Sequence, residues 1–535
     1  MPEPFPDIGL DLDGDDANPA VQLFGRRLFR DQTPLEFLAE LLLVASSTKH
    51  MGDVRVDEGE PLPALAQMRG WPQNGRAVLR YSPHARLSLK LFAFLGASKL
   101  ETRHACHMAH YRELLRALSA AIRCPQHLEK REVLQTLENL FLGFQGIGQN
   151  RTWCAQVFLP VTAALVAAEA VWRQTRSVSE AELTWEKSFP YFGFSQRLFM
   201  ARGGELLYLQ LCNALGVELG QLQGFIAQHE LLLDGNEQDP ASLRDALCDG
   251  ILSVTSRAPQ ALDRVAVWLD NVDGETADKT DSRSVECAWC PKESWPEGYL
   301  FAVELQRICR AAIDPIEKVE MLTICCVFQA LRSLCAQSAR YSDLLDKEAR
   351  SLGSATGFAW VLSPPTMADR TIRHLSARNL VRVQDLIFSA LRHPDIRPDP
   401  RRQDGGYREA DTRYGHKLFL SLAKKTGFVI PYRGPGARFT LNDQLLRFLV
   451  LALVRPGERC SLVSFKDALY KHYGLAVDGD HLRMACRWSE LPELGEAATG
   501  TGAWFEEMLR ESGFLVELSD AFSLVRNPFG TTQDS

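Results

Sequence analysis

The sequence shows little sign of a membrane-spanning segment. Its most apolar stretch, residues 157–172, has 16 residues and contains Pro160 and Glu169, whereas a membrane-spanning helix needs about 20 residues. The opening residues MPEPFPDIGLDLDGDD lack the basic and apolar segments of a secretory signal. We therefore expect a cytoplasmic protein with no membrane partner, in which residues 157–172 form a buried helix.

Catalytic signatures are also scarce. The glycines Gly143, Gly146 and Gly148 follow a helical pattern and no Lys-Ser/Thr pair closes them into a phosphate loop. The His- and Cys-rich run over residues 104–110 lacks the glutamate of the His-Glu-x-x-His metalloprotease motif. We expect a protein that is not an enzyme, and the alternative is an unrecognised metal-dependent enzyme.

Regularly spaced cysteines are missing as well. The 13 cysteines are scattered through a chain of 535 residues, which is typical of buried thiols in a reducing compartment and excludes a disulfide framework. Cys287 and Cys290 form one C-x-x-C motif, and no second one follows. We expect plain thiols and no cofactor, with zinc at Cys287 and Cys290 as the alternative.

What the chain does contain is helical patterning. A capping-box pattern at Thr33, Pro34 and Glu36 precedes the apolar run FLAELLLVA and predicts a helix start. Apolar residues at helical spacing continue to about residue 352, and the polar run NVDGETADKTDSRSVE over 271–286 is typical of a linker. The first two thirds of the chain therefore predict a helical array.

A helix that ends in glycine and runs into a hairpin occurs twice in the last third, over residues 418–441 and 504–525. Gly427 and Gly513 take the same place in the two copies. Helix, glycine, strand, turn and strand is the order of the second half of a winged-helix module. In the first copy we expect helices over 366–378, 381–392 and 412–426 before the hairpin.

The predicted fold class is mainly α, with a multi-domain helical array followed by tandem winged-helix-like modules. The predicted segments are a disordered acidic tail over 1–20, a helical region over 21–269, a loop or linker with the C-x-x-C motif over 270–298, a helical segment over 299–362, a basic module over 363–447 and an acidic module over 448–530.

Charge separates the two modules. Residues 361–447 carry 16 Lys and Arg against 8 Asp and Glu, and such a concentration of positive charge favours a polyanionic partner. DNA is the partner we expect, with RNA possible, while a solvated face without a ligand and an acidic protein surface are the alternatives. The candidate contacts are Arg401, Arg402, Arg413, Lys417, Lys424, Arg433 and Arg438, the last two flanking the hairpin tip.

The second copy has the opposite charge. Glu506, Glu507 and Glu511 lie on its helix, and Glu517 and Asp520 lie on its hairpin. Phosphate would be repelled from such a surface. We therefore expect the second module to contact a protein or to pack internally.

The run GFVIPYRGPGARFTLNDQLLRFLVLALVRPGERCSLVSFKDALYKHYGL and the ending FLVELSDAFSLVRNPF resemble the C-terminal parts of uncharacterised proteins of bacterial defence islands, which encode restriction-like anti-phage systems. The resemblance implies an accessory subunit that acts with separately encoded protein subunits. The expected function is thus a nucleic-acid-binding accessory subunit of an antiviral defence or DNA-processing complex, and the alternative is a protein scaffold that does not bind DNA.

Overall fold

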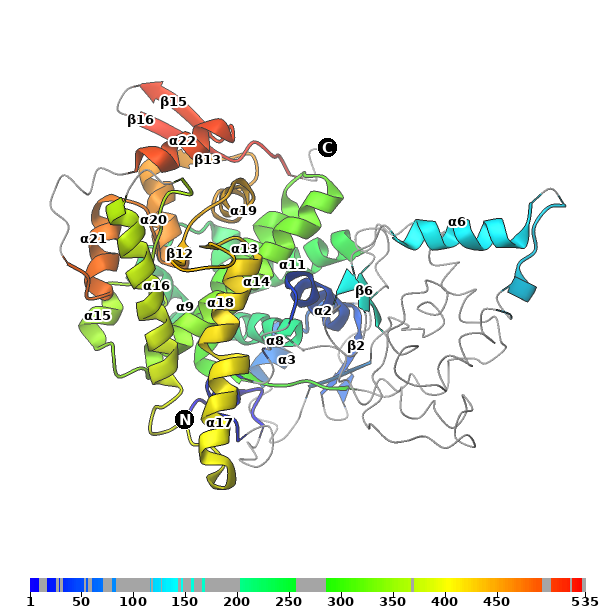
Figure 1. The fold of residues 1–535 in the computed structure, drawn as a ribbon, viewed down its shortest axis with the longest axis horizontal. Helices are drawn as coiled ribbons and strands as arrows, with labels where there is room; N and C mark the ends of the chain where they lie inside the picture. The colour runs from blue at the N-terminus through cyan, green and yellow to red at the C-terminus, as the bar shows by residue number, and fades with distance from the viewer. Residues whose placement is uncertain are drawn as a thin grey trace.

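Helices make up most of the residues that the structure describes, as predicted for a mainly α chain (Figure 1). The computed structural model describes residues 1–8, 17–25, 28, 32–51, 54–55, 60–70, 79–82, 116, 119–126, 128–142, 146–147, 155–157, 166–168, 203–255, 285–366, 370–492, 502–519 and 522–531. The predicted His- and Cys-rich cluster over 104–110 lies outside these residues.

The helices of the first two thirds are α1 (Pro19–Phe24), α2 (Pro34–Ser46), α3 (Leu65–Gly70), α6 (Lys130–Leu142), α8 (Gly203–Leu215), α9 (Leu219–His229), α10 (Gly235–Gln238), α11 (Pro240–Thr255), α13 (Trp295–Arg310), α14 (Pro315–Tyr341) and α15 (Lys347–Ser351). The last third adds α16 (Arg370–Ala390), α17 (Gln403–Glu409), α18 (His416–Lys425), α19 (Asp443–Leu453), α20 (Leu462–Tyr473), α21 (Gly479–Trp488) and α22 (Ala503–Glu511).

Short strands pair in six small sheets among the described residues. An antiparallel sheet has the order β3-β2-β4-β8, with β3 (Val54–Arg55), β2 (Thr48–Met51), β4 (Leu79–Ser82) and β8 (Val285–Glu286). A second has the order β5-β6-β7, with β5 (Gly146–Ile147), β6 (Ala155–Val157) and β7 (Val166–Ala168). The buried helix predicted over 157–172 is therefore wrong where β7 forms, and the short apolar run pairs as a strand instead.

Helix α14 is the centre of the protein. It begins at Pro315, where the Asp314 carboxylate accepts a hydrogen bond from the Ile316 N–H at 2.9 Å, and it packs against α2, α13, α16, α18 and α19. Among the described helices it is the one long and apolar enough to cross a membrane, but 89% of its apolar window is buried inside the protein. Its length and hydropathy are those of a central core helix.

The helix start predicted at Thr33 is confirmed. Helix α2 begins at Pro34, and the Glu36 carboxylate accepts a hydrogen bond from the Thr33 N–H at 3.2 Å. This bond satisfies one of the backbone donors that a helix start leaves without a partner. The buried face of α2 then packs on α8 and α14.

The prediction of a disordered acidic tail over 1–20 is wrong for the residues that the structure describes at each end of this segment. Strand β1 (Pro4–Phe5) pairs with β9 (Cys290–Pro291), and the Phe5 side chain is 3% exposed. At the other end, the Asn18 side chain caps α1 by accepting from the Ala20 N–H at 3.0 Å. Burial of a few apolar side chains holds this segment against the body in spite of its acidic composition.

The linker predicted over 270–298 is wrong for residues 285–298. After β8, the chain places Trp289 and Cys290 in the core with no exposed side-chain surface. The Ala288 N–H donates to the buried Glu205 carboxylate at 2.6 Å, and Tyr81 donates to its other oxygen at 2.8 Å. Ala288, which follows the polar run over 271–286, is thus linked through Glu205 to Tyr81, far away in the chain.

The hydrophobic core of the described residues runs without interruption from Phe5 to Val525, across the segment boundaries predicted at 270, 363 and 447. The Phe328 ring of α14 shows why. It lies 5.0 Å from the Phe428 ring of the first predicted module and 5.1 Å from the Phe448 ring of the second. Both parts of the last third are therefore built onto the same central helix.

The first predicted module differs from its expected helices. One uninterrupted helix, α16, replaces the two helices predicted over 366–378 and 381–392. The helix predicted over 412–426 is broken at Gly415, which separates a π turn (Ala410–Tyr414) from α18. The Gly415 N–H donates to the Ala410 carbonyl at 2.8 Å, so a wider turn ends the first segment before α18 begins.

Candidate nucleic-acid interface

A short hairpin is the centre of the predicted interface. It consists of β11 (Val429–Ile430) and β12 (Arg438–Phe439), which pair antiparallel. Gly427 lies ahead of it with φ +75°, a left-handed conformation that favours glycine, and Gly513 has φ +75° before the second hairpin. An added Cβ at Gly427 would lie 2.6 Å from the Asn442 amide nitrogen. The glycine that the repeat singled out is thus required for the chain to leave α18 and enter the hairpin.

The turn of this hairpin is exposed and carries Tyr432 and Arg433. Both residues lie at the surface, and Tyr432 is 62% exposed. Gly434 and Gly436 follow with φ +100° and +81°, which fixes the shape of the turn. An aromatic ring beside a guanidinium group can stack on a base while the guanidinium contacts a phosphate.

Arg438 does not flank an exposed tip, and this corrects the sequence prediction. Its side chain is 7% exposed and donates to the Pro365 carbonyl at 3.4 Å. Burial lowers the pKa of Arg438, and the positive charge of Arg373 on α16 lowers it further. The buried Nε atoms of Arg438 and Arg373 have no hydrogen-bond partner within the described part of the chain. Two guanidinium groups therefore lie near one another at the base of the hairpin.

The other candidate residues lie on the preceding rod of helices, which Figure 1 shows as α17 followed by α18. Arg401, Arg413 and Lys417 are exposed, and Lys424 is half-buried. Arg413 is paired with Glu409 at 2.9 Å, which reduces its free charge. The side chain of Arg402 lies outside the described residues, although its backbone belongs to a 3₁₀ turn over Pro400–Arg402.

Three acidic residues of the second predicted module have partners inside it, whereas Glu511 is exposed and has no ion pair among the described residues. Glu507 and Glu517 both pair with Arg510, and Glu506 pairs with Lys466 at 3.2 Å. Asp520 lies outside the described residues. These ion pairs neutralise part of the negative charge that the composition implies.

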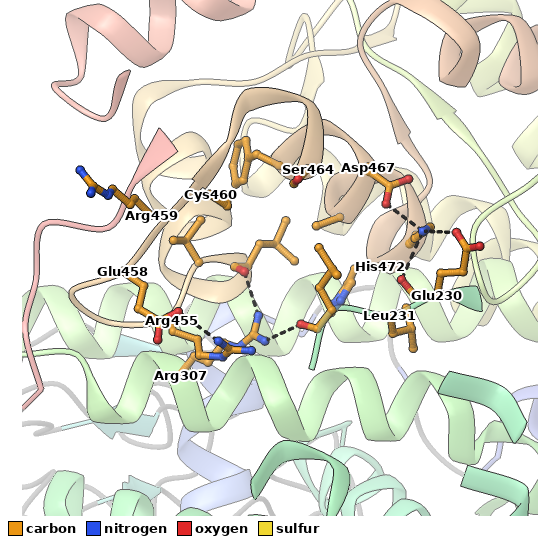
Figure 2. A pocket seen from close by; sticks show the side chains of 16 residues that line it. Glu230, Leu231, Arg307, Arg455, Glu458, Arg459, Cys460, Ser464, Asp467 and His472 are labelled. Atoms are coloured by element: carbon orange, nitrogen blue, oxygen red, sulfur yellow. Dashed lines mark hydrogen bonds and ion pairs between the residues drawn. The ribbon is translucent and has the colours of Figure 1, made fainter. Parts of the chain in front are cut away.

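A cavity of about 260 Å³ lies where the second predicted module meets the helical body (Figure 2). The α9–α10 loop, α13, α20 and the loop before strand β13 (Arg459–Ser461) form its walls. Most of its charged side chains are paired, since Lys471 lies 2.8 Å from Asp467 and Arg455 lies 3.0 Å from Glu458. Burial raises the pKa of the Cys460 thiol to about 11, so the thiol remains protonated and is a poor nucleophile at neutral pH.

Buried ion pairs fasten this junction. Arg307 on α13 binds Glu237 at 2.6 Å and donates to the carbonyls of Ala452 and Leu453, at 3.1 and 2.9 Å. These carbonyls belong to the last turn of α19, where a cation is favoured. Arg307 therefore links α10, α13 and α19 at the wall of the cavity.

A second buried cluster lies deeper. Arg332 on α14 donates to both carboxylate oxygens of Glu304 on α13, each at 2.8 Å, and His472 on α20 lies 2.9 Å from the same carboxylate. Burial alone would raise the pKa of Glu304, but the charge of Arg332 and the His472 hydrogen bond lower it overall. Burial lowers the pKa of His472 in spite of the nearby carboxylate. The folded protein therefore favours an ionised Glu304 and a neutral His472.

This cluster makes stability depend on pH. A histidine whose folded pKa lies below its unfolded value, about 6.5, costs stability as the pH falls through that value, by at most about 1.4 kcal/mol per pH unit. Depression of the Glu304 pKa acts in the same direction below about pH 4.5. We expect the free energy of unfolding to fall between pH 7 and pH 5, and to fall less in His472→Gln, as measured by urea denaturation. Equal pH dependence in the two proteins would contradict this assignment.

The C-x-x-C motif offers poor conditions for zinc. Cys287 and Cys290 are 2% and 0% exposed, and burial raises the pKa of the Cys290 thiol. A structural zinc site needs four ligands, of which this motif supplies two. In the part of the chain that the structure describes, no group of three or more His, Cys, Asp or Glu residues is arranged to hold a metal ion.

Residues that the sequence prediction missed are Arg373, Tyr432, Arg459 and Arg526. Tyr432 was within reach of sequence reasoning, because it adjoins Arg433 at a Pro- and Gly-rich turn. Arg373 faces Arg438 only through the packing of α16 on β12. Arg459 and Arg526 are brought together by strand pairing, for which neither residue carries a local signal.

Comparisons with known proteins give no match: no family model, no curated protein and no solved structure is significantly similar to this chain.

Proposed function

We propose that the protein is a nucleic-acid-binding accessory subunit without catalytic activity, which contacts DNA through the first hairpin and the rod of α17 and α18. Its last third would consist of two winged-helix-like modules packed on α14. The resemblance to defence-island proteins supports a role in a bacterial anti-phage or DNA-processing complex, and we propose that the protein acts there in the cytoplasm together with other protein subunits.

The uncompensated positive charge of the first hairpin carries the proposal. Residues 427–441 contain Arg433 and Arg438 and no Asp or Glu. Within the described residues, no ion pair joins Arg373, Arg433 or Arg438 to a carboxylate, whereas Arg510 beside the second hairpin pairs with two. Guanidinium groups without carboxylate partners favour phosphate as a ligand, and Arg433 is the one exposed on the turn.

Strand order supports the assignment of the second module. Strand β13 pairs with β16 (Phe522–Arg526), which pairs with β15 (Leu515–Ser519), in the order β13-β16-β15. Helix, strand, helices and hairpin follow one another in this order, which is the arrangement of a winged-helix module. The first module has only the hairpin, with Ser363 bridged in parallel to Thr440 beside it.

The proposal predicts salt-dependent DNA binding by the full chain. The full chain is needed because β10 (Trp360–Val361), directly ahead of the first module, pairs with β14 (Leu475–Ala476) of the second, so an isolated fragment would lose this pairing. We expect the double variant Lys417→Ala/Arg433→Ala to bind duplex DNA about tenfold more weakly and to reduce the slope of log K against log salt by about two. Fluorescence anisotropy over a salt series measures both quantities.

The matched control is Arg483→Ala, which removes an exposed arginine paired with Asp480 on α21. We expect this variant to bind DNA like the unchanged protein. Failure of the unchanged protein to bind duplex DNA or single-stranded RNA at low salt would refute the proposal. Equal binding by the double variant and the control would remove the first hairpin from the interface.

A further inference from the structure

The outer face of the C-terminal sheet brings two arginines together. Arg459 on β13 and Arg526 on β16 are direct cross-strand partners, so their side chains project from the same face, and both are exposed. Like charges placed directly opposite one another destabilise a sheet. Among the ion pairs of the described residues, neither arginine has a carboxylate partner. The fold thus holds two positive charges together without compensation.

Apolar side chains lie beside this arginine pair. Val516 on β15 is the cross-strand partner of Leu524, which places both on the face of Arg526. Phe522 is two residues from Leu524 on the same strand. Val516 and Phe522 are 36% and 51% exposed, and Leu518 of the same hairpin is 58% exposed. A surface that combines exposed apolar groups with charge is typical of a protein-binding site.

The arginine pair and Val516 border an open hollow of about 610 Å³, which Gly457 and Glu458 complete. The Glu458 carboxylate pairs with Arg455 at 3.0 Å. Strand β15 is the last strand of its sheet, so one side of its backbone has no strand partner among the described residues. An extended peptide can add to such an edge and place alternate side chains on one face.

We propose that this face, formed by Arg459, Arg526, Val516, Phe522 and Leu524, binds an extended acidic and apolar segment of a partner protein. A carboxylate of the segment would contact the arginine pair, and its apolar side chains would cover Val516 and Phe522. Charge complementarity selects an acidic partner at the arginines. The proposal does not depend on DNA binding by the first hairpin.

A polypeptide fits this face better than a nucleic acid does. Glu458 is exposed and borders the same hollow as the arginine pair. A nucleic acid carries one negative charge per nucleotide and would meet this carboxylate as well as the arginines. A peptide can place a carboxylate at the arginine pair and neutral groups elsewhere.

The test uses the full chain and a fluorescein-labelled peptide of roughly ten residues that alternates glutamate with leucine or phenylalanine. A peptide with lysine in place of glutamate is the matched probe. We expect the acidic peptide to bind, and Arg459→Glu/Arg526→Glu to weaken that binding at least about tenfold. Phe522→Ser should weaken it several-fold, whereas Arg483→Glu on α21 should leave it unchanged.

The proposal is overturned if the acidic peptide does not bind at concentrations up to about 1 mM, or if the lysine peptide binds as tightly as the acidic one. It is also overturned if Arg459→Glu/Arg526→Glu binds the acidic peptide as tightly as the unchanged protein does. Loss of duplex DNA binding in that variant, with peptide binding retained, would overturn it as well. Because the altered residues are exposed, we expect the variants to melt at the same temperature as the unchanged protein. Equal melting temperatures would exclude unfolding as the cause of weaker binding. DNA binding in Lys417→Ala/Arg433→Ala is measured separately, so failure of one proposal is distinguishable from failure of the other.

Discussion

Replacement of Glu304 by leucine is expected to lower the free energy of unfolding by about 3–5 kcal/mol. The change leaves the Arg332 guanidinium buried, with 0% of its side chain exposed, and without the carboxylate that accepts a hydrogen bond from each of its two terminal nitrogens. It also removes the hydrogen-bond partner of the His472 ring. The remaining contacts of Arg332, which include the Gln329 side chain at 2.8 Å, do not neutralise its charge.

The matched control is Glu409→Leu, which breaks the ion pair to Arg413. That pair is exposed, with 65% of the Arg413 side chain accessible, so its loss should cost no more than about 1 kcal/mol. Urea denaturation followed by circular dichroism measures both variants. If Glu304→Leu is as stable as Glu409→Leu, the buried cluster contributes no more than a surface pair.

Substitution of Gly204 by alanine should be nearly as damaging, with a loss of about 3 kcal/mol or more. Gly204 lies in α8 where this helix crosses α2. A Cβ atom there would clash with the Phe37 carbonyl oxygen and would lie 2.6 Å from the Leu41 nitrogen. These are backbone atoms of α2, so the two helices would have to separate, and the hydrogen bond from the Gly204 N–H to Glu40 at 3.1 Å would lengthen.

Gly224 provides the control because it is also a helical glycine. It lies within α9, and an added Cβ would meet nothing within 4 Å. Gly224→Ala should therefore raise stability by about 0.5–1 kcal/mol, since alanine loses less backbone entropy on folding. Thermal denaturation of the two variants should give shifts of opposite sign. A loss of stability in Gly224→Ala similar to that in Gly204→Ala would contradict the close helix contact.

The central position of α14 limits how the proposed modules can act. Phe328 contacts aromatic rings from both parts of the last third, and Arg332 contacts Glu304 and the His472 carbonyl. The first hairpin follows Phe428, and the second packs on α20 and α22 of a module whose α19 and α20 contact α14, so one core connects the two hairpins. A DNA contact at the first hairpin and a protein contact at the second sheet would then be held in one geometry.

Local signals predicted the elements that depend on neighbouring residues. The start of α2 at Pro34 follows from its capping residues, and the two hairpins follow from Gly427 and Gly513, whose positive φ no other residue adopts as readily. The mainly helical class follows from apolar periodicity. Exposure of Arg413, Lys417 and Arg433 also agrees with their polar surroundings in the sequence.

Local sequence signals could not predict contacts between residues that are far apart in the chain. The polar run before Cys287 predicts a linker, yet Ala288 binds Glu205 from another part of the chain. Arg438 belongs to a turn that is polar and glycine-rich, yet packing on α16 buries it. In each case the side chain's position depends on which segment packs against it, and the neighbouring residues do not encode that choice.

The sequence by itself determined the helical class, the repeated glycine-hairpin unit and the excess of positive charge over residues 361–447, because propensity, conformation and charge are properties of nearby residues. Only the tertiary structure decided that both hairpins share the core of α14, that Glu304, Arg332 and His472 form one buried cluster, and that Arg459 faces Arg526. Those arrangements require segments far apart in the chain to pair and to bury one another. The free energy of the whole fold decides which segments do so.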